Sequence, residues 1–463
     1  MYQELPYALI SSLRGTTGFD EASFINAHTS GERLISVRFN PIKYITSNDQ
    51  YTVCSSQLPL TTVVPWCPYG QYLSERPLFT FDPLFHAGLY YVQEASSMFL
   101  WQILQQTIGS NTQDLRVLDL CAAPGGKSTL LTSYFKDGLV VANEVIKSRA
   151  NILVENMTKW GYANTVVTNN DPKNFQRLQD YFDVMVIDAP CSGSGLFRKD
   201  PEAVTEWSEE AVMLCSQRQQ RILADSYSCL KKDGILIYST CSYSPEEDEA
   251  ISDWLMDNFQ LSSININLQQ EWNIVETVSS KHKAFGYRFY PGKVQGEGLY
   301  IAAFTKKDGA SFSVPNNKLP LLSKTEENLW HDWVSNPEDL LLFRQKESVI
   351  AIPAKWQNDI ALLQKNLYIK TAGTLLGNLK GKDIIPHHAL ALSTITSRQV
   401  DRTEFTREQA IQYLQKKDIA IDIHTLSKGW TLASYCGLPL GWMKVLPNRI
   451  NNYYPAEWRI LKN

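Results

Sequence analysis

The 463-residue sequence has no apolar run of the ~18 residues that a membrane-spanning helix needs. Its first residues, Met-Tyr-Gln-Glu-Leu-Pro, lack the basic segment and the following apolar segment of a secretory signal peptide. There is also no internal repeat and no low-complexity tract. With 44% hydrophobic and 20% charged residues, extended disorder is excluded as well. We therefore expect a cytoplasmic protein of two to four globular domains.

The eight cysteines include no pair with CxxC spacing, which is the pattern of zinc ribbons and thioredoxin-like sites. We therefore expect no bound metal. Each cysteine must either pack in a core or take part in chemistry. We predict that Cys215 and Cys229, which we place on one helical face with Val212 and Ile222, are packing residues.

The chain also lacks an overall basic charge, because its formal net charge is −4. Binding to nucleic acid would therefore have to come from a local patch. Residues 386–463 contain 10 Lys and Arg against 6 Asp and Glu, a surplus of +4, whereas the other 385 residues contain 34 against 42, or −8. The C-terminal segment is therefore the candidate for contact with an anionic partner.

Between about residues 115 and 305, short apolar runs alternate with helical stretches. The runs do not alternate between polar and apolar residues, which is typical of strands buried on both faces of a parallel sheet. They are Arg116–Leu120, Val140–Glu144, Thr165–Thr168, Phe182–Asp188, Ile235–Thr240 and Leu299–Phe304. We predict a doubly wound, Rossmann-like α/β domain.

Changes in this pattern divide the chain into four parts. Residues 1–80 have mixed patterning, and residues 81–307 contain the α/β alternation. Residues 308–385 begin with a linker, DGASFSVPNNKLPLL, and continue as a further α/β segment. Residues 386–463 return to short strand-like runs separated by Gly and Pro, which indicates a small β-rich module.

A turn of small residues joins the first predicted strand to a helix, in the sequence DLCAAPGGKS from Asp119 to Ser128. Such a turn lets a ligand approach the backbone N–H groups at the start of the helix. A nucleotide-binding P-loop would need Gly at position 121, which is Cys here, and the GxGxxG of dinucleotide-binding folds is absent. The turn therefore predicts a ligand site of another class.

Acidic residues stand at the ends of the successive strands. Glu144 ends the second strand and could accept hydrogen bonds from a ribose diol, while Asp171 follows the third strand and Asp188 ends the fourth. The alternative is that Glu144 and Asp171 only cap the helices that follow them. Together with the small-residue turn, the site interpretation is favoured.

Two cysteines also follow strands at this edge, Cys191 in DAPCSGSG and Cys241 in STCS. Carbon 5 of cytosine accepts a methyl group only when a thiolate has added to carbon 6, and a base must afterwards remove the carbon-5 proton. Two thiols beside one sulfonium methyl donor could divide these tasks.

We predict that Cys121, inside the turn, is a packing residue.

At these residues the sequence resembles the Sun/nucleolar-protein family of RNA cytosine carbon-5 methyltransferases. The segments that carry the resemblance are DLCAAPGGK (119–127), DAPCSGSG (188–195), YSTCS (238–242), YVQEASSM (91–98) and SVRFNPIK (36–43). The similarity covers roughly residues 30–305. It departs at Arg288–Gly292, where family members often carry His after the Pro and this chain has Gly.

The resemblance implies that S-adenosylmethionine is the cofactor, that Cys241 is the nucleophile and that Cys191 promotes product release. Cytosine methyltransferases that act on DNA attack instead with the cysteine of their Pro-Cys motif. The implied cofactor-binding residues are Ala122, Ala123, Pro124, Gly125, Gly126, Lys127, Ser128, Glu144, Asp171 and Asp188. Residues 1–80 would be an RNA-recognition region and residues 81–307 the methyltransferase domain.

The final segment, Gly437–Leu461, resembles the PUA-like module of bacterial 16S rRNA methyltransferases of the F type. Its aromatics Trp442, Tyr453, Tyr454 and Trp458 could stack on bases, or they could be the core of a small β-module. The expected partner is RNA, most simply 16S rRNA or the small ribosomal subunit, and we expect a monomer with no membrane contact. The rival functions are methylation of a tRNA cytosine and non-catalytic assembly of the ribosome.

Overall fold

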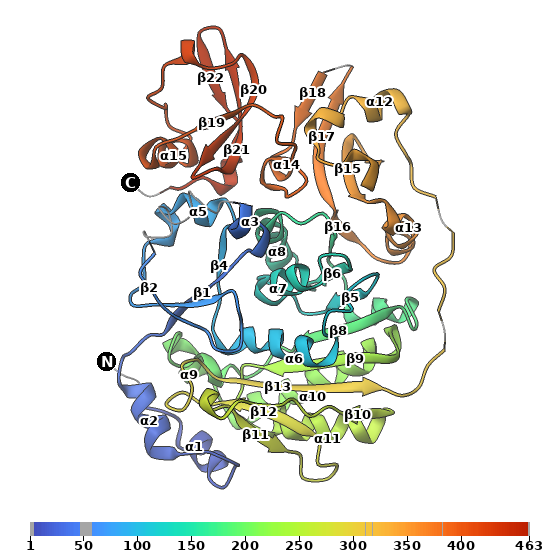
Figure 1. Cartoon of the computed structure of the whole chain (residues 1–463). Helices are drawn as coiled ribbons and strands as arrows, with labels where there is room; N and C mark the ends of the chain where they lie inside the picture. The colour runs from blue at the N-terminus through green and yellow to red at the C-terminus, as the bar shows by residue number, and fades with distance from the viewer. Residues whose placement is uncertain (1–3, 47–57, 311, 317, 382, 462–463) are drawn as a thin grey trace.

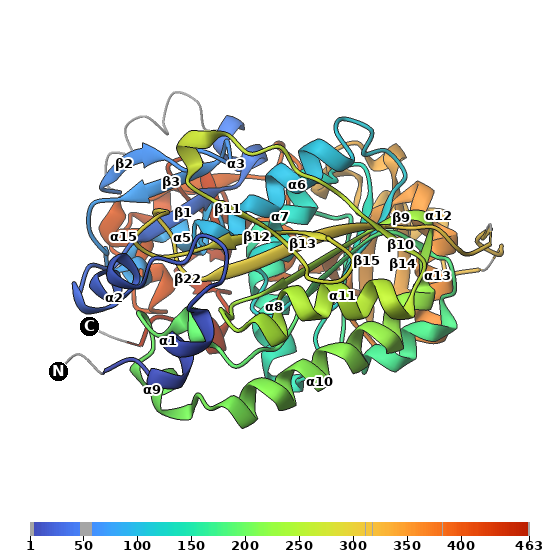
Figure 2. The ribbon, with the colours of Figure 1, turned by 90° about the horizontal axis from the view of Figure 1, so that it is seen from below.

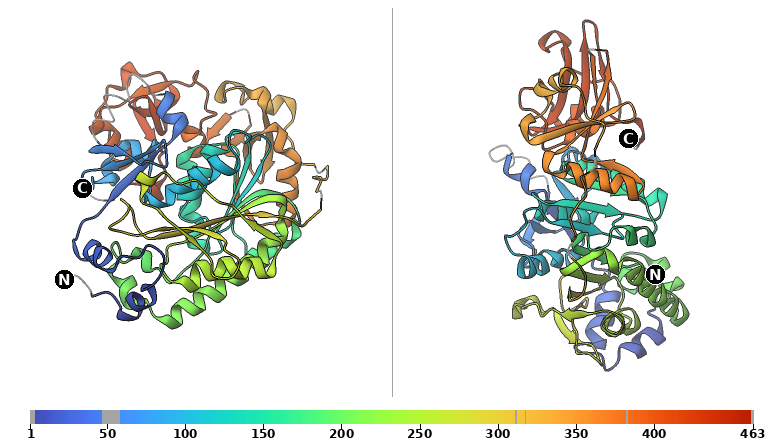
Figure 3. Two further views of the ribbon diagram at one scale, coloured as in Figure 1. Left: turned by 60° about the horizontal axis from the view of Figure 1, so that its bottom comes forward. Right: turned by 90° about the vertical axis from the view of Figure 1, so that its right-hand side faces the viewer.

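The computed structural model describes residues 4–46, 58–310, 312–316, 318–381 and 383–461, which form four sheets and their covering helices (Figure 1). None of the helices within these ranges is long and apolar enough to cross a membrane. Most of the chain after the linker, coloured orange and red, lies at one end of the molecule, and the long green helices lie towards the other (Figure 3).

The N-terminal part is a pair of helices followed by a four-stranded sheet in the order β2-β3-β1-β4. Asp20 caps the second helix by accepting a hydrogen bond from the Ser23 N–H at 3.1 Å. The elements are α1 (Tyr7–Leu13), α2 (Glu21–Thr29), β1 (Ile35–Phe39), α3 (Pro41–Thr46), β2 (Leu60–Val63), β3 (Gly70–Leu73), α5 (Pro83–His86) and β4 (Tyr90–Val92).

The central sheet has the order β11-β12-β13-β9-β8-β5-β6-β7-β16, with β10 paired to β13. The five strands from β9 to β7 are parallel. The strands are β5 (Arg116–Asp119), β6 (Leu139–Asn143), β7 (Thr165–Thr168), β8 (Phe182–Asp188), β9 (Leu230–Thr240), β10 (Leu261–Ser263), β11 (Val275–Val278), β12 (Phe285–Phe289), β13 (Leu299–Lys306) and β16 (Ile369–Ala372). All six predicted strands are present, and the expected fold class is confirmed.

Helices cover both faces of this sheet, because successive residues of each buried strand point to opposite sides. Val140 packs in the cluster on the face of α6 and α7, whereas Val141 packs in the cluster on the face of α10 and α11. Figure 2 shows α10 and α11 side by side below the sheet. The helices are α6 (Leu100–Thr107), α7 (Gly126–Tyr134), α8 (Lys147–Trp160), α9 (Pro201–Glu206), α10 (Glu209–Ser226) and α11 (Glu249–Asn258).

One strand differs from the prediction in direction. Leu299–Lys306 (β13) is buried like the others but runs antiparallel to β9, with Ile301 opposite Ser239. The chain leaves β9 through α11 and then forms β10 and the β11–β12 hairpin, so it returns to β9 from the opposite end. Burial on both faces alone does not specify strand direction, and the parallel assignment of this strand was wrong.

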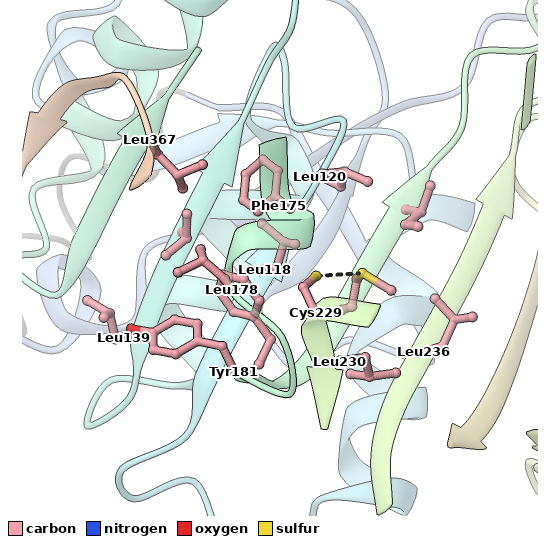
Figure 4. Close-up of a cluster of buried hydrophobic side chains, with 14 of the residues drawn as sticks. Leu118, Leu120, Leu139, Phe175, Leu178, Tyr181, Cys229, Leu230, Leu236 and Leu367 are labelled. Atoms are coloured by element: carbon pink, nitrogen blue, oxygen red, sulfur yellow. Dashed lines mark hydrogen bonds between the residues drawn. The ribbon is translucent and has the colours of Figure 1, made fainter. Parts of the chain in front are cut away.

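A segment beyond the linker completes the central sheet. β16 pairs antiparallel with β7, and the Gly373 N–H donates to the Thr165 carbonyl at 2.7 Å. Leu367, just before β16, packs in the same buried cluster as Phe175 and Leu178 (Figure 4). Cys229 lies in this cluster, in a 3-10 turn after α10 rather than on the helix itself, and its thiol donates to the Met185 sulfur at 3.9 Å.

The C-terminal part contains two four-stranded sheets, β14-β15-β17-β18 and β19-β20-β21-β22. The last sheet does not stand apart, because Phe405, Tyr413 and Tyr454 share one hydrophobic cluster with Val37 and Leu84 of the N-terminal part. The elements are α12 (Lys324–Asn328), β14 (Leu340–Gln345), β15 (Ser348–Pro353), α13 (Gln357–Asn366), β17 (Thr374–Lys380), β18 (Asp383–Pro386), α14 (His388–Leu392), β19 (Arg402–Glu404), α15 (Arg407–Leu414), β20 (Gly429–Tyr435), β21 (Leu438–Leu446) and β22 (Arg449–Asn452).

Gly161 is the point at which α8 meets the C-terminal part. It ends α8 with a φ of +88°, and its carbonyl accepts hydrogen bonds from the Thr394 N–H at 2.8 Å and the Ser393 hydroxyl at 3.0 Å. A Cβ added here would lie 2.3 Å from the Leu392 carbonyl oxygen. Only glycine fits, because both the backbone angle and the neighbouring backbone exclude a side chain.

We expect Gly161→Ala to destabilise the protein by about 2–4 kcal/mol, combining the strain of a left-handed residue with a backbone clash. Gly15→Ala is the matched control, because Gly15 also has a φ of +88° but no atom within 4 Å of the added Cβ. The control should lose only the strain of about 1–2 kcal/mol. Chemical denaturation measures both, and equal losses would contradict the proposed clash with Leu392.

Candidate active site

The carboxyl ends of β5, β6, β8 and β9 meet at one edge of the central sheet, because these strands are parallel. A cavity of about 460 Å³ opens there. The predicted site residues that line it are Ala123, Glu144, Asp171, Asp188, Cys191 and Cys241. The structure thus brings both cysteines and three of the acidic residues to one cavity.

The other predicted residues of the small-residue turn, Ala122, Pro124, Gly125, Gly126, Lys127 and Ser128, are not among the lining residues of this cavity. They form the layer behind it. Gly125 has a φ of +118°, and a Cβ there would lie 3.2 Å from the Leu153 side chain of α8. Ser128 is fully buried and donates to Asp119 at 2.6 Å. These contacts fix the path of the turn.

The N-terminal sheet holds this turn from the other side. Arg38 of β1 is 1% exposed and donates to the Thr129 hydroxyl at 2.6 Å and to the Gly126 carbonyl at 3.3 Å. Its guanidinium also lies over the Trp160 ring, 4.6 Å from the centroid. Burial lowers the pKa of Arg38 to about 10, so the side chain stays charged at neutral pH.

Glu144 and Asp171 have contacts that fit both of the interpretations left open by the sequence. The Glu144 carboxylate accepts from the Ile146 N–H at 2.9 Å and pairs with Arg149 at 3.5 Å. Asp171 accepts from the Lys173 N–H at 3.0 Å and so caps the turn after β7. Both residues also line the cavity. Capping and ligand binding therefore do not exclude each other here.

Lys127 and Asp188 form an ion pair, with 2.8 Å between Nζ and Oδ1. The Ser239 hydroxyl donates to the same carboxylate oxygen at 2.8 Å. Burial alone would lower the pKa of Lys127, but the charge and hydrogen bond of Asp188 outweigh it and raise the pKa. The Asp188 side chain is 39% exposed and lines the cavity, whereas the Lys127 side chain is 10% exposed and lies in the layer behind it.

The sulfur atoms of Cys191 and Cys241 lie 2.9 Å apart at the cavity wall. Both side chains are partly buried thiols. The hydrogen bond with Cys241, and then burial, raise the pKa of Cys191 well above its usual value. Because two thiols at this distance do not both ionise, the geometry keeps Cys191 protonated as the partner of Cys241.

Several residues of the site were not predicted from the sequence. Val145 and Ile146 expose apolar side chains to the cavity next to Glu144, and Arg218 and Arg221 lie at its edge on successive turns of α10. Glu247 is fully buried and accepts hydrogen bonds from the serines that follow the two cysteines. The only signal for Glu247 was its place six residues after Cys241, which on its own indicates nothing.

Two other cysteines have environments that agree with a packing role. Cys121 packs against the cluster on the α10 face but also lines the cavity, and burial raises its pKa. Cys215 lies on α10 and is partly buried, with its pKa also raised by burial. Neither forms a hydrogen bond with another thiol as Cys191 and Cys241 do.

Comparison with known proteins gives the family. Residues 106–305 match the family model described as 16S rRNA methyltransferase RsmB/F, residues 5–95 match the N-terminal domain of 16S rRNA methyltransferase RsmF, and residues 401–460 match the methyltransferase RsmF PUA domain. The ribosomal RNA small subunit methyltransferase F of Psychromonas ingrahamii is 31% identical over 444 residues, covering 91% of this chain and 90% of the relative. The chain belongs to the ribosomal RNA small subunit methyltransferase F family.

Other members and solved structures agree with this assignment. The methyltransferase F of Shewanella oneidensis is 29% identical over 445 residues, covering 91% of this chain and 90% of its own. A methyltransferase homologue from Pyrococcus horikoshii is 26% identical, with a TM-score of 0.51, and covers 65% of this chain and 100% of its own. PH0851 has the same fold, with a TM-score of 0.56 and 23% identity over 65% of this chain and 66% of its own. The resemblance to F-type enzymes is confirmed.

The departure at Gly292 has a local cause in this methyltransferase F family member. Gly292 has a φ of +92°, and an added Cβ would lie 2.8 Å from the Ser23 carbonyl oxygen. Ser23 belongs to α2, which packs close against this turn. A histidine could not be accommodated at this position unless α2 moved.

Proposed function

We propose that this protein methylates carbon 5 of a cytosine in 16S rRNA, with Cys241 as nucleophile and Cys191 as the residue that assists release. The observation that carries the proposal is the pair of sulfur atoms 2.9 Å apart at the ends of two adjacent parallel strands, facing one cavity. Two thiols in this arrangement can divide addition to a pyrimidine ring and its reversal between them.

The residues of the cavity fit S-adenosylmethionine, which when bound supplies a methyl group from a cationic sulfur. Glu144 and Asp171 would bind the hydroxyl groups of its ribose. Val145 and Ile146 offer apolar surface for its adenine ring. Asp188 adds negative charge close to the thiols, which suits a cationic centre. We propose that the turn from Ala122 to Ser128 completes this site through its backbone.

Cys241 is proposed to add to carbon 6 of the cytosine. Its thiol is held by the Cys191 thiol and lies in the field of the Lys127 ammonium. The addition makes carbon 5 nucleophilic. The cytosine must be unpaired or flipped out to expose its ring face, which costs a few kcal/mol.

Cys191 is proposed to act after carbon 5 has gained its methyl group. The carbon-5 proton must then be removed, and the electrons of that C–H bond re-form the ring double bond as the Cys241–carbon 6 bond breaks. Cys191 is in contact with the departing sulfur, so its thiol can give a proton to Cys241 as the bond breaks, and the Cys191 thiolate that results can take up the carbon-5 proton. The Lys127–Asp188 pair is the other candidate for orienting the base at this stage.

RNA binding outside the cavity is proposed for residues 1–80 and for the C-terminal module. Of the four aromatics singled out from the sequence, Trp442 and Tyr454 are buried in the core, whereas Tyr453 is 42% exposed. Tyr453 packs edge-on against Trp430, and Lys444 lies over the Trp430 ring at 5.2 Å. An exposed aromatic next to a cation suits a base and its phosphate.

The division into four parts, residues 1–80, 81–307, 308–385 and 386–463, is retained as a proposal for the functional units. We further propose that the enzyme works as a cytoplasmic monomer without a metal. The ribosomal name of the relatives favours rRNA over tRNA as substrate. The presence of both cysteines and the acidic residues argues against a purely structural role in ribosome assembly.

Cys241→Ala should abolish methyl transfer, because the proposed mechanism assigns the addition to carbon 6 to the Cys241 thiol alone. Cofactor affinity should stay within a few-fold of wild type. The measurements are transfer of labelled methyl groups to 16S rRNA and calorimetry with S-adenosylmethionine. Near-normal turnover would overturn the mechanism, and transfer to tRNA alone would overturn the substrate.

Glu144→Ala should weaken S-adenosylmethionine binding by about 1.5–3 kcal/mol, the value of a hydrogen bond to a charged group. Asp200→Ala is the control, since Asp200 also caps a helix through a 3.0 Å hydrogen bond from the Glu202 N–H but does not line the cavity. Calorimetry compares the two variants. If Glu144→Ala binds as tightly as the control, its carboxylate serves only the local backbone.

Cys191→Ala should leave Cys241 able to attack but slow to depart. Methylated RNA should then remain bonded to the protein through denaturing electrophoresis when S-adenosylmethionine is present, and the double variant lacking Cys241 should show no such band. The reverse pattern, with an adduct in Cys241→Ala only, would make Cys191 the nucleophile. Normal turnover without an adduct would reduce Cys191 to a packing residue.

A further inference from the structure

Each of the two cysteines at the cavity is followed by a serine, and both serines donate to the same carboxylate. The hydroxyls of Ser192 and Ser242 lie 2.5 and 2.6 Å from Oε2 of Glu247. The Ser192 N–H donates to Oε1 at 2.9 Å. One side chain thus joins the loop after β8, which carries Cys191, to the loop after β9, which carries Cys241.

Glu247 is itself held in place from two further elements. The Gln219 amide of α10 donates to Oε1 at 3.0 Å, and the Tyr238 hydroxyl of β9 donates to the Glu247 carbonyl at 2.7 Å. The carboxylate therefore receives four hydrogen bonds while being fully buried. Burial raises the pKa of Glu247, and the hydrogen bonds from the two serines and Gln219 oppose that shift.

A buried carboxylate is unfavourable unless donors surround it, so its presence directly behind two reactive thiols calls for a reason. Beyond the ends of β8 and β9, two backbone groups of the described residues connect the loops: the Gly195 N–H donates to the Cys241 carbonyl at 2.8 Å, and the Tyr243 N–H donates to the Ser194 hydroxyl at 2.9 Å. Glu247 adds a separate connection directly behind the thiols, because it accepts both of the serine hydroxyl bonds.

We propose that Glu247 is a positioning residue that holds the Cys191 loop and the Cys241 loop at the separation at which their thiols act as a pair. This rests on the proposed function, because it concerns the same two cysteines. Glu247 touches neither substrate nor cofactor in this role. It acts through Ser192 and Ser242, and its loss removes the hydroxyl bonds that join the two loops directly behind the thiols.

This role predicts different effects on the two steps of the reaction, attack on the cytosine and release of the methylated product. Attack on carbon 6 needs only Cys241, whereas release needs Cys191 to stay in contact with the departing sulfur. Loss of Glu247 is therefore expected to slow release more than attack. The covalent RNA adduct should accumulate in a Glu247 variant although both cysteines are present.

The separation of the thiols can be tested without RNA, by oxidation with diamide. The two thiols lose two hydrogen atoms to diamide, which becomes its hydrazine, and one S–S bond forms between Cys191 and Cys241. Peptide mapping by mass spectrometry follows that bond. In Glu247→Ala and Glu247→Gln the disulfide should form about 5–10-fold more slowly than in the wild type, because the thiols meet less often. Glu246→Ala, at the exposed neighbouring position, should match the wild type.

The direction of the change in the oxidation rate distinguishes a positioning role of Glu247 from an effect of its charge. The charge of Glu247 raises the pKa of the Cys191 thiol, so an effect of charge alone would make Glu247→Gln form more thiolate and oxidise faster. Slower oxidation supports the positioning role, and equal or faster oxidation overturns it. Should Glu247→Ala fail to bind S-adenosylmethionine, Ser242→Ala replaces it. That variant should oxidise about 3-fold more slowly, and wild-type rates would again overturn the proposal.

The gel experiment distinguishes this inference from the mechanism on which it rests. If Cys191→Ala and Glu247→Ala both give the RNA adduct, both ideas stand. An adduct in Cys191→Ala with normal turnover in Glu247→Ala overturns the role of Glu247 alone. If Cys191→Ala gives no adduct, the assignment of Cys191 fails, and the diamide rates still decide whether Glu247 sets the distance between the thiols.

Discussion

The parallel pairing of β8 with β5 on one side and with β9 on the other is the constraint on which the site depends. It brings the strand ends at Asp119, Asp188 and Thr240 to one edge of the sheet. The turn before α7 and both cysteine loops therefore begin next to one another in space. Neither cysteine is near the other in sequence. Strand order brings the two cysteine loops to the same edge of the sheet, and the contacts between the loops then set the separation of the thiols.

This arrangement removes several charged groups from water, which is unfavourable, and each of these groups has partners. Lys127 has Asp188, Glu247 has four donors, and Arg38 has Gln93, Thr129 and the Trp160 ring. Each hydrogen bond from a neutral group to one of these charges contributes about 1.5–3 kcal/mol, so removing one donor or acceptor is destabilising. The same networks connect the N-terminal sheet to the turn and the turn to the cysteine loops. Stability and geometry of the site are therefore carried by the same side chains.

The sequence predicted the elements of the central sheet well, because buried strands such as Phe182–Asp188 are apolar on both faces and end in polar residues. It did not predict the direction of β13, since the pattern of apolar residues in a buried strand does not depend on the direction in which the strand runs. It also missed β16, whose pairing with β7 joins residues some 200 positions apart. In the site, residues with a motif of their own were found. Glu247, Arg218 and Ile146 were not, because their roles arise only when separate loops and helices meet.

The shared core of the first and last sheets has a consequence for how RNA reaches the cavity. Because Val37 and Leu84 pack with Tyr413 and Tyr454, the C-terminal module is held against the N-terminal part rather than joined by a free tether. Gly161 and β16 join the C-terminal part to the central sheet as well. An RNA strand that contacted Tyr453 and entered the cavity past Arg218, as we propose, would therefore meet two surfaces of one packed structure. Such an arrangement would select RNA by its folded shape, since a target cytosine would enter only when the rest of its helix or loop fitted both surfaces at once.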